Sequence, residues 1–401
     1  MAEFRTLDDL DVRGKRVLVR VDLNVPMKGG RVTDMTRLER LKPTLDELAR
    51  RGARVILLSH LGRPDGKQSP ALSLEPLVVP LTEVLGGRRP RFAHDCVGPE
   101  AEAVARNLAD GEIALLENLR FEPGEEANDL AFARKLAALG ELYVDDAFSC
   151  AHRAHASVEA LARLLPAAPG RLMEAELEAL SRALEYPARP LAALVGGAKV
   201  STKLALLDNL LDKVDALIVG GGMANTFLAA QGREVGTSLC ERDLMATARA
   251  ILAGAAERKR AILLPFDVAV ASRLAPGEAV RIVAVDAVPA DQMILDIGPE
   301  TAEALAKRLE ECRTLVWNGP LGAFETPPFD AGTMRVARAA AALTRAGKLL
   351  TVAGGGDTVA ALSHSGVVEA FSYVSTAGGA FLEWLEGKEL PGVEALKAAA
   401  R

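Results

Sequence analysis

Short apolar runs alternate with longer amphipathic segments along the whole 401-residue chain, and this alternation restricts the fold more than any other feature. The apolar runs are nearly continuous rather than alternating with polar residues, which is typical of strands buried on both faces. The alternation therefore predicts an α/β fold with mostly parallel sheets covered by helices. We expect strands at residues 16–21, 55–58, 112–116, 142–144, 191–195, 216–219, 261–264, 281–285, 314–317 and 349–353.

Helices are expected where apolar residues recur with a period near 3.6. One of them, residues 171–186, lies between a proline-rich break at 166–170 and Pro187, which makes it a candidate connector between domains. A chain of this length is too long for one ordinary core, so two domains are expected. The remaining helices are expected at residues 36–51, 74–85, 98–108, 129–139, 204–211, 242–258, 299–311 and 331–345.

Composition excludes several classes of function. The formal net charge of −6 does not favour binding to nucleic acid or to an anionic membrane surface, so anion binding has to come from local clusters of Arg and Lys. The four cysteines are far apart, which argues against a zinc site or a disulfide framework. The N-terminus lacks an apolar signal segment, and no apolar stretch approaches the roughly 20 residues that span a bilayer. We expect a cytoplasmic protein.

The central stretch from Val195 to Lys203 has the pattern of a phosphate-binding junction between a strand and a helix. Two glycines follow the expected strand, and Lys199 and Lys203 precede the expected helix. Such a turn lets the backbone and a helix N-terminus approach a phosphate, although the stretch is not a Walker A loop. The two lysines would share a helix face if the helix began before Lys199. An ordinary glycine turn with solvated lysines is the alternative.

In the first half of the chain, arginines and histidines gather after the expected strands. Ligands bind beyond the carboxyl ends of strands in open α/β sheets, and Arg grips phosphate or carboxylate with two hydrogen bonds. The pattern therefore predicts a small ligand with several negative charges. Surface ion pairs and structural histidines are the alternatives, and for His155 we favour the structural one. The residues are Arg20, Asp22, Asn24, Arg37, His60, Arg63, Arg120, His152, Arg153 and His155.

In the second half, glycines take these places. They occur at residues 196–197, 220–222, 319 and 354–356, and together with two lysines and Asp357 they suit a polyphosphate with Mg²⁺. Tight turns are again the alternative. An anion on one domain and a nucleotide on the other could exchange a phosphoryl group, a reaction that needs alignment and positive charge.

Six motifs together resemble the phosphoglycerate kinase family from about Val12 to about Val393. The resemblance implies two Rossmann-like three-layer α/β/α domains joined by a hinge helix. It divides the chain into a phosphoglycerate-binding domain (1–170), a hinge helix (171–186), a nucleotide-binding domain (187–380) and a segment returning to the first domain (381–401). The motifs are Arg20-Val-Asp-Leu-Asn-Val-Pro26, Ser59-His-Leu-Gly-Arg-Pro64, Ala151-His-Arg-Ala-His-Ala-Ser157, Gly196-Gly-Ala-Lys-Val-Ser-Thr-Lys203, Gly354-Gly-Gly-Asp-Thr358 and Ser375-Thr-Ala-Gly-Gly-Ala380.

The implied activity is reversible phosphoryl transfer between 1,3-bisphosphoglycerate and ADP, giving 3-phosphoglycerate and ATP, by a monomer that closes about its hinge. Arg37, Lys199 and Lys203 would act on the group in transfer, and Asp357 would bind Mg²⁺. The implied substrate residues are Asp22, Leu23, Asn24, Arg37, His60, Leu61, Gly62, Arg63, Arg120 and Arg153. The implied nucleotide residues are Lys203, Glu325, Gly354, Gly355, Gly356, Asp357 and Thr358.

Three positions depart from the family's common pattern. Ser149-Cys150 stands where Gly-Thr is common, Met35 where a polar residue is usual, and Ala323 where valine is commoner. None of these changes removes an implied ligand, so an active enzyme is expected. A non-catalytic nucleotide-binding scaffold is the alternative, and a dinucleotide-dependent dehydrogenase is disfavoured because no G-x-G-x-x-G follows a strand.

Overall fold

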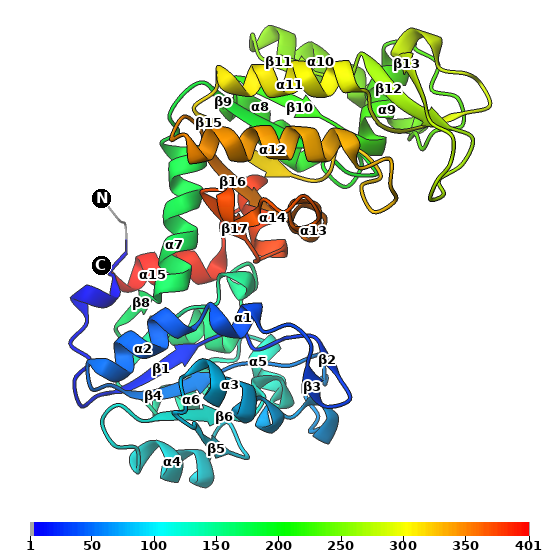
Figure 1. Cartoon of the computed structure of the whole chain (residues 1–401). Helices are drawn as coiled ribbons and strands as arrows, with labels where there is room; N and C mark the ends of the chain where they lie inside the picture. The colour runs from blue at the N-terminus through cyan, green and yellow to red at the C-terminus, as the bar shows by residue number, and fades with distance from the viewer. Residues whose placement is uncertain (1–3, 401) are drawn as a thin grey trace. The chain divides into compact units, whose positions relative to one another are not determined.

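Two six-stranded parallel sheets dominate the computed structural model, which describes residues 4–400 (Figure 1). One sheet belongs to unit 1, the residues up to Leu177 together with those from Glu389 onward. The other belongs to unit 2, Glu178–Lys388. The predicted α/β class with mostly parallel sheets is confirmed.

The sheet of unit 1 has a switch point between β1 and β7. The chain adds strands on one side of β1 and then returns to its other side at β7, so the strand exits on both sides face the same edge. The strand order is β5 (Arg91–Ala93), β6 (Ile113–Leu116), β4 (Arg54–Leu58), β1 (Arg16–Arg20), β7 (Leu142–Asp145) and β8 (Ala167–Pro169). A short hairpin, β2 (Met27–Lys28) and β3 (Arg31–Val32), follows β1.

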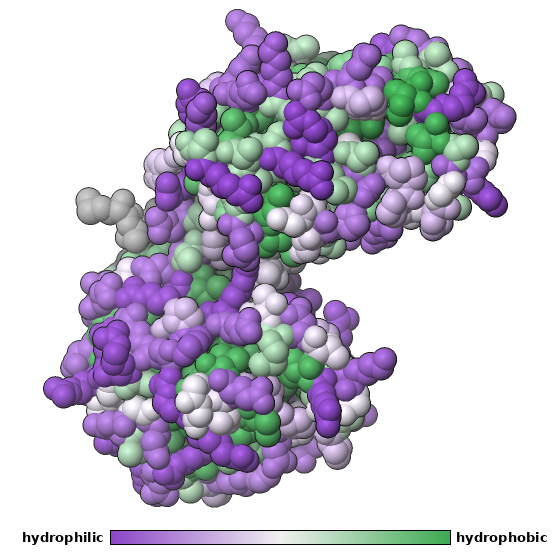
Figure 2. Space-filling model, viewed as in Figure 1, coloured by the Kyte–Doolittle hydropathy of each residue, from purple (hydrophilic) through white to green (hydrophobic). Residues whose placement is uncertain are grey.

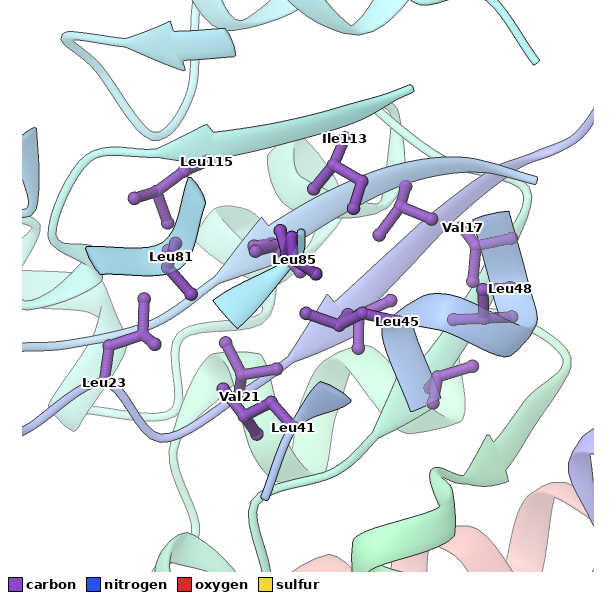
Figure 3. Close-up of a cluster of buried hydrophobic side chains, with 14 of the residues drawn as sticks. Val17, Val21, Leu23, Leu41, Leu45, Leu48, Leu81, Leu85, Ile113 and Leu115 are labelled. Atoms are coloured by element: carbon purple, nitrogen blue, oxygen red, sulfur yellow. The ribbon is translucent and has the colours of Figure 1, made fainter. Parts of the chain in front are cut away.

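The helix predicted at residues 36–51 is interrupted. The structure has α1 (Thr36–Glu39) and α2 (Lys42–Arg50), because the ring of Pro43 cannot follow the carbonyl of Glu39 within one continuous helix. The apolar stripe nevertheless faces the sheet, and Leu41, Leu45 and Leu48 pack among residues of the strands (Figure 3). The other helices of unit 1 are α3 (Val78–Val84), α4 (Pro99–Arg106), α5 (Pro123–Glu126), α6 (Leu130–Ala137) and α15 (Pro391–Ala399).

The sheet of unit 2 has its switch point between β9 and β15. Counted in chain order its six strands run 3-2-1-4-5-6, the order of doubly wound dinucleotide-binding folds. The strands are β11 (Ala261–Leu263), β10 (Ala216–Val219), β9 (Leu191–Val195), β15 (Thr314–Asn318), β16 (Leu350–Gly354) and β17 (Tyr373–Ser375). The central stretch that begins at Val195 therefore leaves the sheet at its switch point.

Helices α11 and α12 lie side by side against the unit 2 sheet (Figure 1). The stripe of small residues Ala337, Ala340 and Ala341 is fully buried in this core. The helices of unit 2 are α8 (Leu204–Lys213), α9 (Gly221–Ala230), α10 (Met245–Glu257), α11 (Pro299–Glu310), α12 (Ala331–Arg345), α13 (Gly356–His364) and α14 (Gly379–Leu385).

The strand predicted at residues 281–285 does not join the parallel sheet. It forms β13 (Arg281–Ala284) of a small antiparallel sheet with β12 (Asp267–Ala271) and β14 (Met293–Ile297), near α9 (Figure 1). Neither β12 nor β14 was predicted. Regular alternation of strands and helices is therefore suspended between α10 and α11.

The connector is helical but not uniform. Helix α7 (Arg171–Leu180) continues as a π-helical turn, Ser181–Glu185. Its first turn is fixed to unit 1, because the Asp146 carboxylate accepts from Leu172 N and Met173 N at 3.0 and 3.1 Å. The Arg171 guanidinium adds ion pairs with three carboxylates, Asp8, Glu47 and Glu174.

The predicted proline-rich break at residues 166–170 is wrong in part, because β8 (Ala167–Pro169) joins the sheet edge beside β7. Helix α15 from the end of the chain lies next to β8 (Figure 1). Its Gly392 N donates to Ala151 O at 2.9 Å. Unit 1 is therefore completed by residues from both ends of the chain.

Hydrophilic residues cover most of the face drawn in Figure 2, with smaller hydrophobic patches between them. Among residues 4–400, no helix is long and apolar enough to cross a membrane.

Candidate active site

Asp22 occupies the exit of β1 at the switch point of unit 1. Its carboxylate is buried, and three hydrogen bonds fix its orientation. Oδ1 accepts from Asn24 N at 3.0 Å, whereas Oδ2 accepts from Arg37 Nη1 at 2.9 Å and from Ser149 Oγ at 2.6 Å. Ser149 follows β7, so this contact joins the strand exits on the two sides of the switch point.

Arg37 lies in α1 and is one-third exposed. Its Nη1 also donates to the carbonyl of Asn24 at 2.8 Å. Two acceptors on the first strand exit therefore hold the guanidinium in one orientation, while part of it stays open to solvent. A positive group held in this way can meet an anion without reorganising first.

A second arginine is built into the exits of β4 and β6. Arg120 donates from Nη1 to Gly62 O at 2.7 Å, and Gly62 N donates to Asn24 Oδ1 at 3.1 Å. Glu126 lies 3.2 Å from Arg120 Nε. Burial lowers the pKa of Arg120, because the charged guanidinium has lost contact with water. An anion bound beside it would offset this cost, so the site favours an anionic ligand. The structure thus brings Asp22, Asn24, Arg37, Gly62 and Arg120 into one connected group.

The other predicted substrate residues fall into two classes. Arg63 and Arg153 are exposed. The side chains of Leu23 and Leu61 are buried in the core, so only their backbone could face a ligand. The Leu23 amide already donates to Ser59 Oγ at 2.9 Å.

The prediction that Arg20 belongs to the ligand-facing arginines is wrong. Only 1% of it is exposed, and its Nε donates to Ser157 Oγ at 2.9 Å. Its Nη2 lies 3.0 Å from Nδ1 of His60. Because a guanidinium can only donate, Nδ1 accepts, and a neutral His60 carries its proton on Nε2. Burial and the neighbouring Arg20 and Arg120 lower the pKa of His60, which keeps the ring neutral.

His155 is buried behind this group. Burial, together with the neighbouring arginines Arg120, Arg20 and Arg153, lowers its pKa to about 4. Its Nδ1 lies 3.9 Å from the buried carboxylate of Glu125. These surroundings are those of a structural histidine, the interpretation favoured from the sequence.

Lys203 occupies the corresponding switch point of unit 2. Helix α8 begins at Leu204, so the condition under which Lys199 and Lys203 would share a helix face is not met, and Lys199 is exposed in the preceding loop. Lys203 Nζ donates to Asn318 Oδ1, and Asn318 Nδ2 donates to Gly354 O at 2.7 Å. Burial lowers the pKa of Lys203.

Asn318 is therefore a candidate site residue that the sequence analysis did not single out. It is the last residue of β15 and links the exits of β9 and β16 through one amide. Its signal in the sequence is its place directly after the strand expected at residues 314–317, before Gly319 and Pro320. Thr358 is tied to the same junction, because its Oγ1 accepts from Gly319 N at 2.7 Å.

The glycines at these exits serve different purposes. A Cβ on Gly196 would lie 1.9 Å from Pro320 O, and one on Gly354 would lie 2.6 Å from the Phe381 ring, so packing alone requires both glycines. Gly355 has a φ of +97°, which favours glycine. A Cβ on Gly356 would meet nothing within 4 Å. At that position, at the start of α13, the structure leaves room for a ligand.

A cavity of about 650 Å³ lies in unit 2 among these junctions. Its volume is within the range of small-molecule sites. Its walls are largely apolar, with Leu239, Leu274 and Phe324. Three acidic residues also line it, the buried Asp296 and the exposed Glu325 and Asp357. The helix N-terminus of α9 also reaches it through Gly221 and Gly222. The arrangement suits a flat apolar group with a polar and anionic extension.

The two other departures lie at less critical places. Met35 is partly buried and packs against the core of unit 1. Ala323 lines the cavity, and its amide donates to Leu295 O at 2.8 Å, a contact that any side chain except proline would allow.

Comparison with known proteins gives one consistent result. A family model described as phosphoglycerate kinase matches residues 7–388. A phosphoglycerate kinase of Methylorubrum extorquens is 62% identical over 399 residues, which cover 99% of this chain and 100% of that protein. The solved structure of phosphoglycerate kinase from Coxiella burnetii superposes with a TM-score of 0.93 at 44% identity, covering 99% and 100% of the two chains. That of the enzyme from Pyrococcus horikoshii gives 0.81 at 32% identity and 98% of both chains.

Proposed function

Because this chain belongs to the phosphoglycerate kinase family, we propose that it catalyses reversible phosphoryl transfer between 1,3-bisphosphoglycerate and ADP, giving 3-phosphoglycerate and ATP, in glycolysis or gluconeogenesis. The observation that carries the proposal is the extent of the relationship, which spans both units. In the direction of ATP use, a carboxylate oxygen of 3-phosphoglycerate bonds to the γ-phosphorus, and the bond from that phosphorus to the oxygen bridging to ADP breaks.

Unit 1 would bind the phosphoglycerate. Three arginines at the carboxyl ends of the unit 1 strands match a ligand with a phosphate and a carboxylate. They are Arg37, Arg63 and Arg120. The neutral ring of His60 can donate from Nε2 without adding a further charge. The full set is Asp22, Leu23, Asn24, Arg37, His60, Leu61, Gly62, Arg63, Arg120 and Arg153.

Unit 2 would bind the nucleotide. The apolar cavity suits the base, the Glu325 carboxylate a ribose hydroxyl, and the α13 N-terminus the phosphates. Lys199 and Lys203 would supply positive charge there. The nucleotide residues are Lys203, Glu325, Gly354, Gly355, Gly356, Asp357 and Thr358.

Asp357 fits the Mg²⁺ that accompanies ATP in such reactions. Its carboxylate is exposed, lines the cavity and stands in the first turn of α13, where phosphates are expected. Mg²⁺ commonly takes one or two protein carboxylates and completes its shell with water and phosphate oxygens. When bound, the ion would neutralise charge on the nucleotide phosphates.

The chain's own contribution to transfer would be positioning and positive charge. Phosphoryl transfer needs little covalent help from the protein, and positive groups around the moving phosphoryl group lower the barrier. Arg37, Lys199 and Lys203 are the groups proposed for this task. Arg37 is held by Asp22 and by the Asn24 carbonyl, and Lys203 is held by Asn318.

We further propose a cytoplasmic monomer that binds neither nucleic acid nor membrane. The acidic net charge and the scattered cysteines support these proposals. One chain carries both units, so no second copy is needed to complete the substrate set.

A coupled assay with 3-phosphoglycerate, ATP and Mg²⁺ that follows ADP release tests the function directly. We expect turnover by the wild type, and we expect Arg37→Ala to lower it by about 10³ or more, since arginines acting on a transferring phosphoryl group contribute about 10³–10⁵. Arg91→Ala is the control, because that arginine forms only an exposed ion pair with Glu112. A wild type without turnover would favour the non-catalytic nucleotide-binding scaffold, and an Arg37→Ala variant with normal turnover would remove Arg37 from the chemistry.

A further inference from the structure

Ser149 makes the shortest of the three hydrogen bonds to the Asp22 carboxylate, and its position departs from the family's common glycine. The O–H···O distance of 2.6 Å is in the range of hydrogen bonds to an ionised acceptor. Ser149 is half-buried in a 3₁₀ turn after β7, and it lies 127 residues from Asp22 in the sequence. A short hydrogen bond from a second strand exit therefore holds the same carboxylate oxygen that Arg37 of α1 contacts.

The bond changes what Asp22 can still accept. An ionised carboxylate offers about four lone-pair positions. Both positions on Oδ2 are taken, one by Arg37 and one by Ser149, and one position on Oδ1 is taken by Asn24 N. Among the residues that the structure describes, these three are its donors, so one position remains, on Oδ1. With a glycine at residue 149, Oδ2 would keep a second open position.

The carboxylate also has little freedom to turn. Asp22 is only 7% exposed, and its two oxygens are held from three different segments of unit 1. A rotation that offered Oδ2 to a ligand would break the contacts with Ser149 and Arg37 together. The remaining acceptor position therefore points in one direction before any ligand arrives.

We propose that Ser149 is a positioning residue of the substrate site, which acts through Asp22 by leaving it one acceptor position for a hydroxyl group of the ligand. It would thereby favour a phosphorylated acid that carries a hydroxyl beside its carboxylate, as 3-phosphoglycerate does. The inference rests on the proposed function, which assigns Asp22 to the phosphoglycerate side. Ser149 itself need not touch the ligand.

The test compares 3-phosphoglycerate with 3-phosphonooxypropanoate, which lacks the hydroxyl. Binding is measured by calorimetry and turnover by the coupled assay. Without Ser149 the Asp22 carboxylate would have to be ordered when the ligand binds. This cost should raise the Kd and KM of Ser149→Ala for 3-phosphoglycerate by about three- to tenfold, with kcat within about twofold. Affinity for the analogue should stay unchanged, so the preference between the two ligands should fall by the same factor. Ser149→Thr, which keeps a hydroxyl, should restore it.

Two further variants serve as controls for this test. Ser149→Gly places the family's common residue there and carries the same expectation if the alanine variant does not fold. Ser272→Ala removes a similar serine–carboxylate bond, Ser272 Oγ to Glu278 Oε1 at 2.9 Å, from an exposed part of unit 2. It should change neither ligand's affinity.

Three results would overturn the proposal: wild-type affinities in Ser149→Ala, an equal loss for both ligands, or tighter binding of 3-phosphoglycerate. A wild type that turns over but does not prefer 3-phosphoglycerate to the analogue would remove the role of Asp22, and that of Ser149 with it. A wild type without turnover would instead count against the proposed function, and the calorimetric preference would still decide the role of Ser149.

Discussion

At the scale of single residues, one arrangement occurs in both units: a side chain at the end of the returning strand, or just after it, contacts a charged side chain across the switch point. In unit 1 Ser149 holds Asp22, and in unit 2 Asn318 holds Lys203. Each of these contacts joins the exits of two neighbouring strands. Fixed charges stabilise a transition state more effectively than mobile ones, because they need not reorganise during the reaction.

Lys203→Ala tests whether this lysine serves chemistry or folding. Turnover should fall by about 10² to 10³, the usual cost of removing one fixed charge stabiliser. The midpoint of thermal unfolding should move by only about 2–4 °C, because the half-buried ammonium contributes little to the core. Calorimetric unfolding and the coupled assay check the two values, with Lys213→Ala at the far end of α8 as control. A collapsed midpoint with intact activity per folded molecule would assign Lys203 a structural role.

The sequence identified most of the residues gathered at the strand exits but could not separate ligand-facing arginines from internal ones. Arg20 and Arg63 both follow apolar runs, yet Arg20 is buried and Arg63 is exposed. The partners that hold Arg20 inside, His60 and Ser157, lie 40 and 137 residues away. Spacing along the chain carries no information about contacts at that separation.

At the scale of elements, the inner strands of the two parallel sheets were predictable, whereas of their four edge strands only β11 was predicted, and β5, β8 and β17 were not. Strands β9 and β10 were predicted with their observed ends, because continuous apolar runs between helices are strong signals. Strand β8 was predicted as a break, since its three residues end at Pro169. A sheet edge tolerates such a proline, because its missing amide removes no inner hydrogen bond. The sequence around β8 does not show that it lies at an edge.

Asp146, which follows β7 and accepts hydrogen bonds from the first turn of α7, should make stability depend on pH. Burial raises its pKa to about 7, above its ordinary 3.8, and the nearby Asp145 adds to the effect. Between these pH values the folded chain holds a proton that the unfolded chain has lost. The free energy of unfolding therefore falls as pH rises from about 4 to 7.

Asp146→Asn should remove that part of the decline while keeping an oxygen for Leu172 N and Met173 N. Between pH 4 and 7, the free energy of unfolding of the variant should rise relative to that of the wild type by about 2 to 4 kcal/mol. Urea midpoints from pH 4.5 to 7.5 measure the difference, and exposed Asp291→Asn is the control. Asp145 titrates in both proteins, so it cannot produce a difference between them. Parallel curves of unfolding free energy against pH would therefore contradict the assignment of the decline to Asp146.

At the scale of the whole molecule, the proposed function assigns one substrate to each unit, and hydrogen exchange can test this assignment. We expect 3-phosphoglycerate to slow exchange at the exits of β1, β4 and β6, and ATP with Mg²⁺ to slow it at the exits of β9, β15 and β16. With the ligand at a hundred times its Kd, the free energy of the opening that allows exchange should rise by up to about 2.7 kcal/mol. Inorganic phosphate at equal concentration controls for charge alone. Protection of unit 2 by 3-phosphoglycerate without effect on unit 1 would reverse the assignment.

The return of α15 to unit 1 has a consequence for synthesis on the ribosome. All six strands of the unit 1 sheet have been made by Pro169, yet the helix that contacts Ala151 and Val158 comes from residues 391–399. The whole of unit 2 is translated in between. Domains usually complete folding in order from the N-terminus. Here the first unit to be made is the last to be finished, and a transcript that ended before residue 391 would yield a complete unit 2 beside an unfinished unit 1.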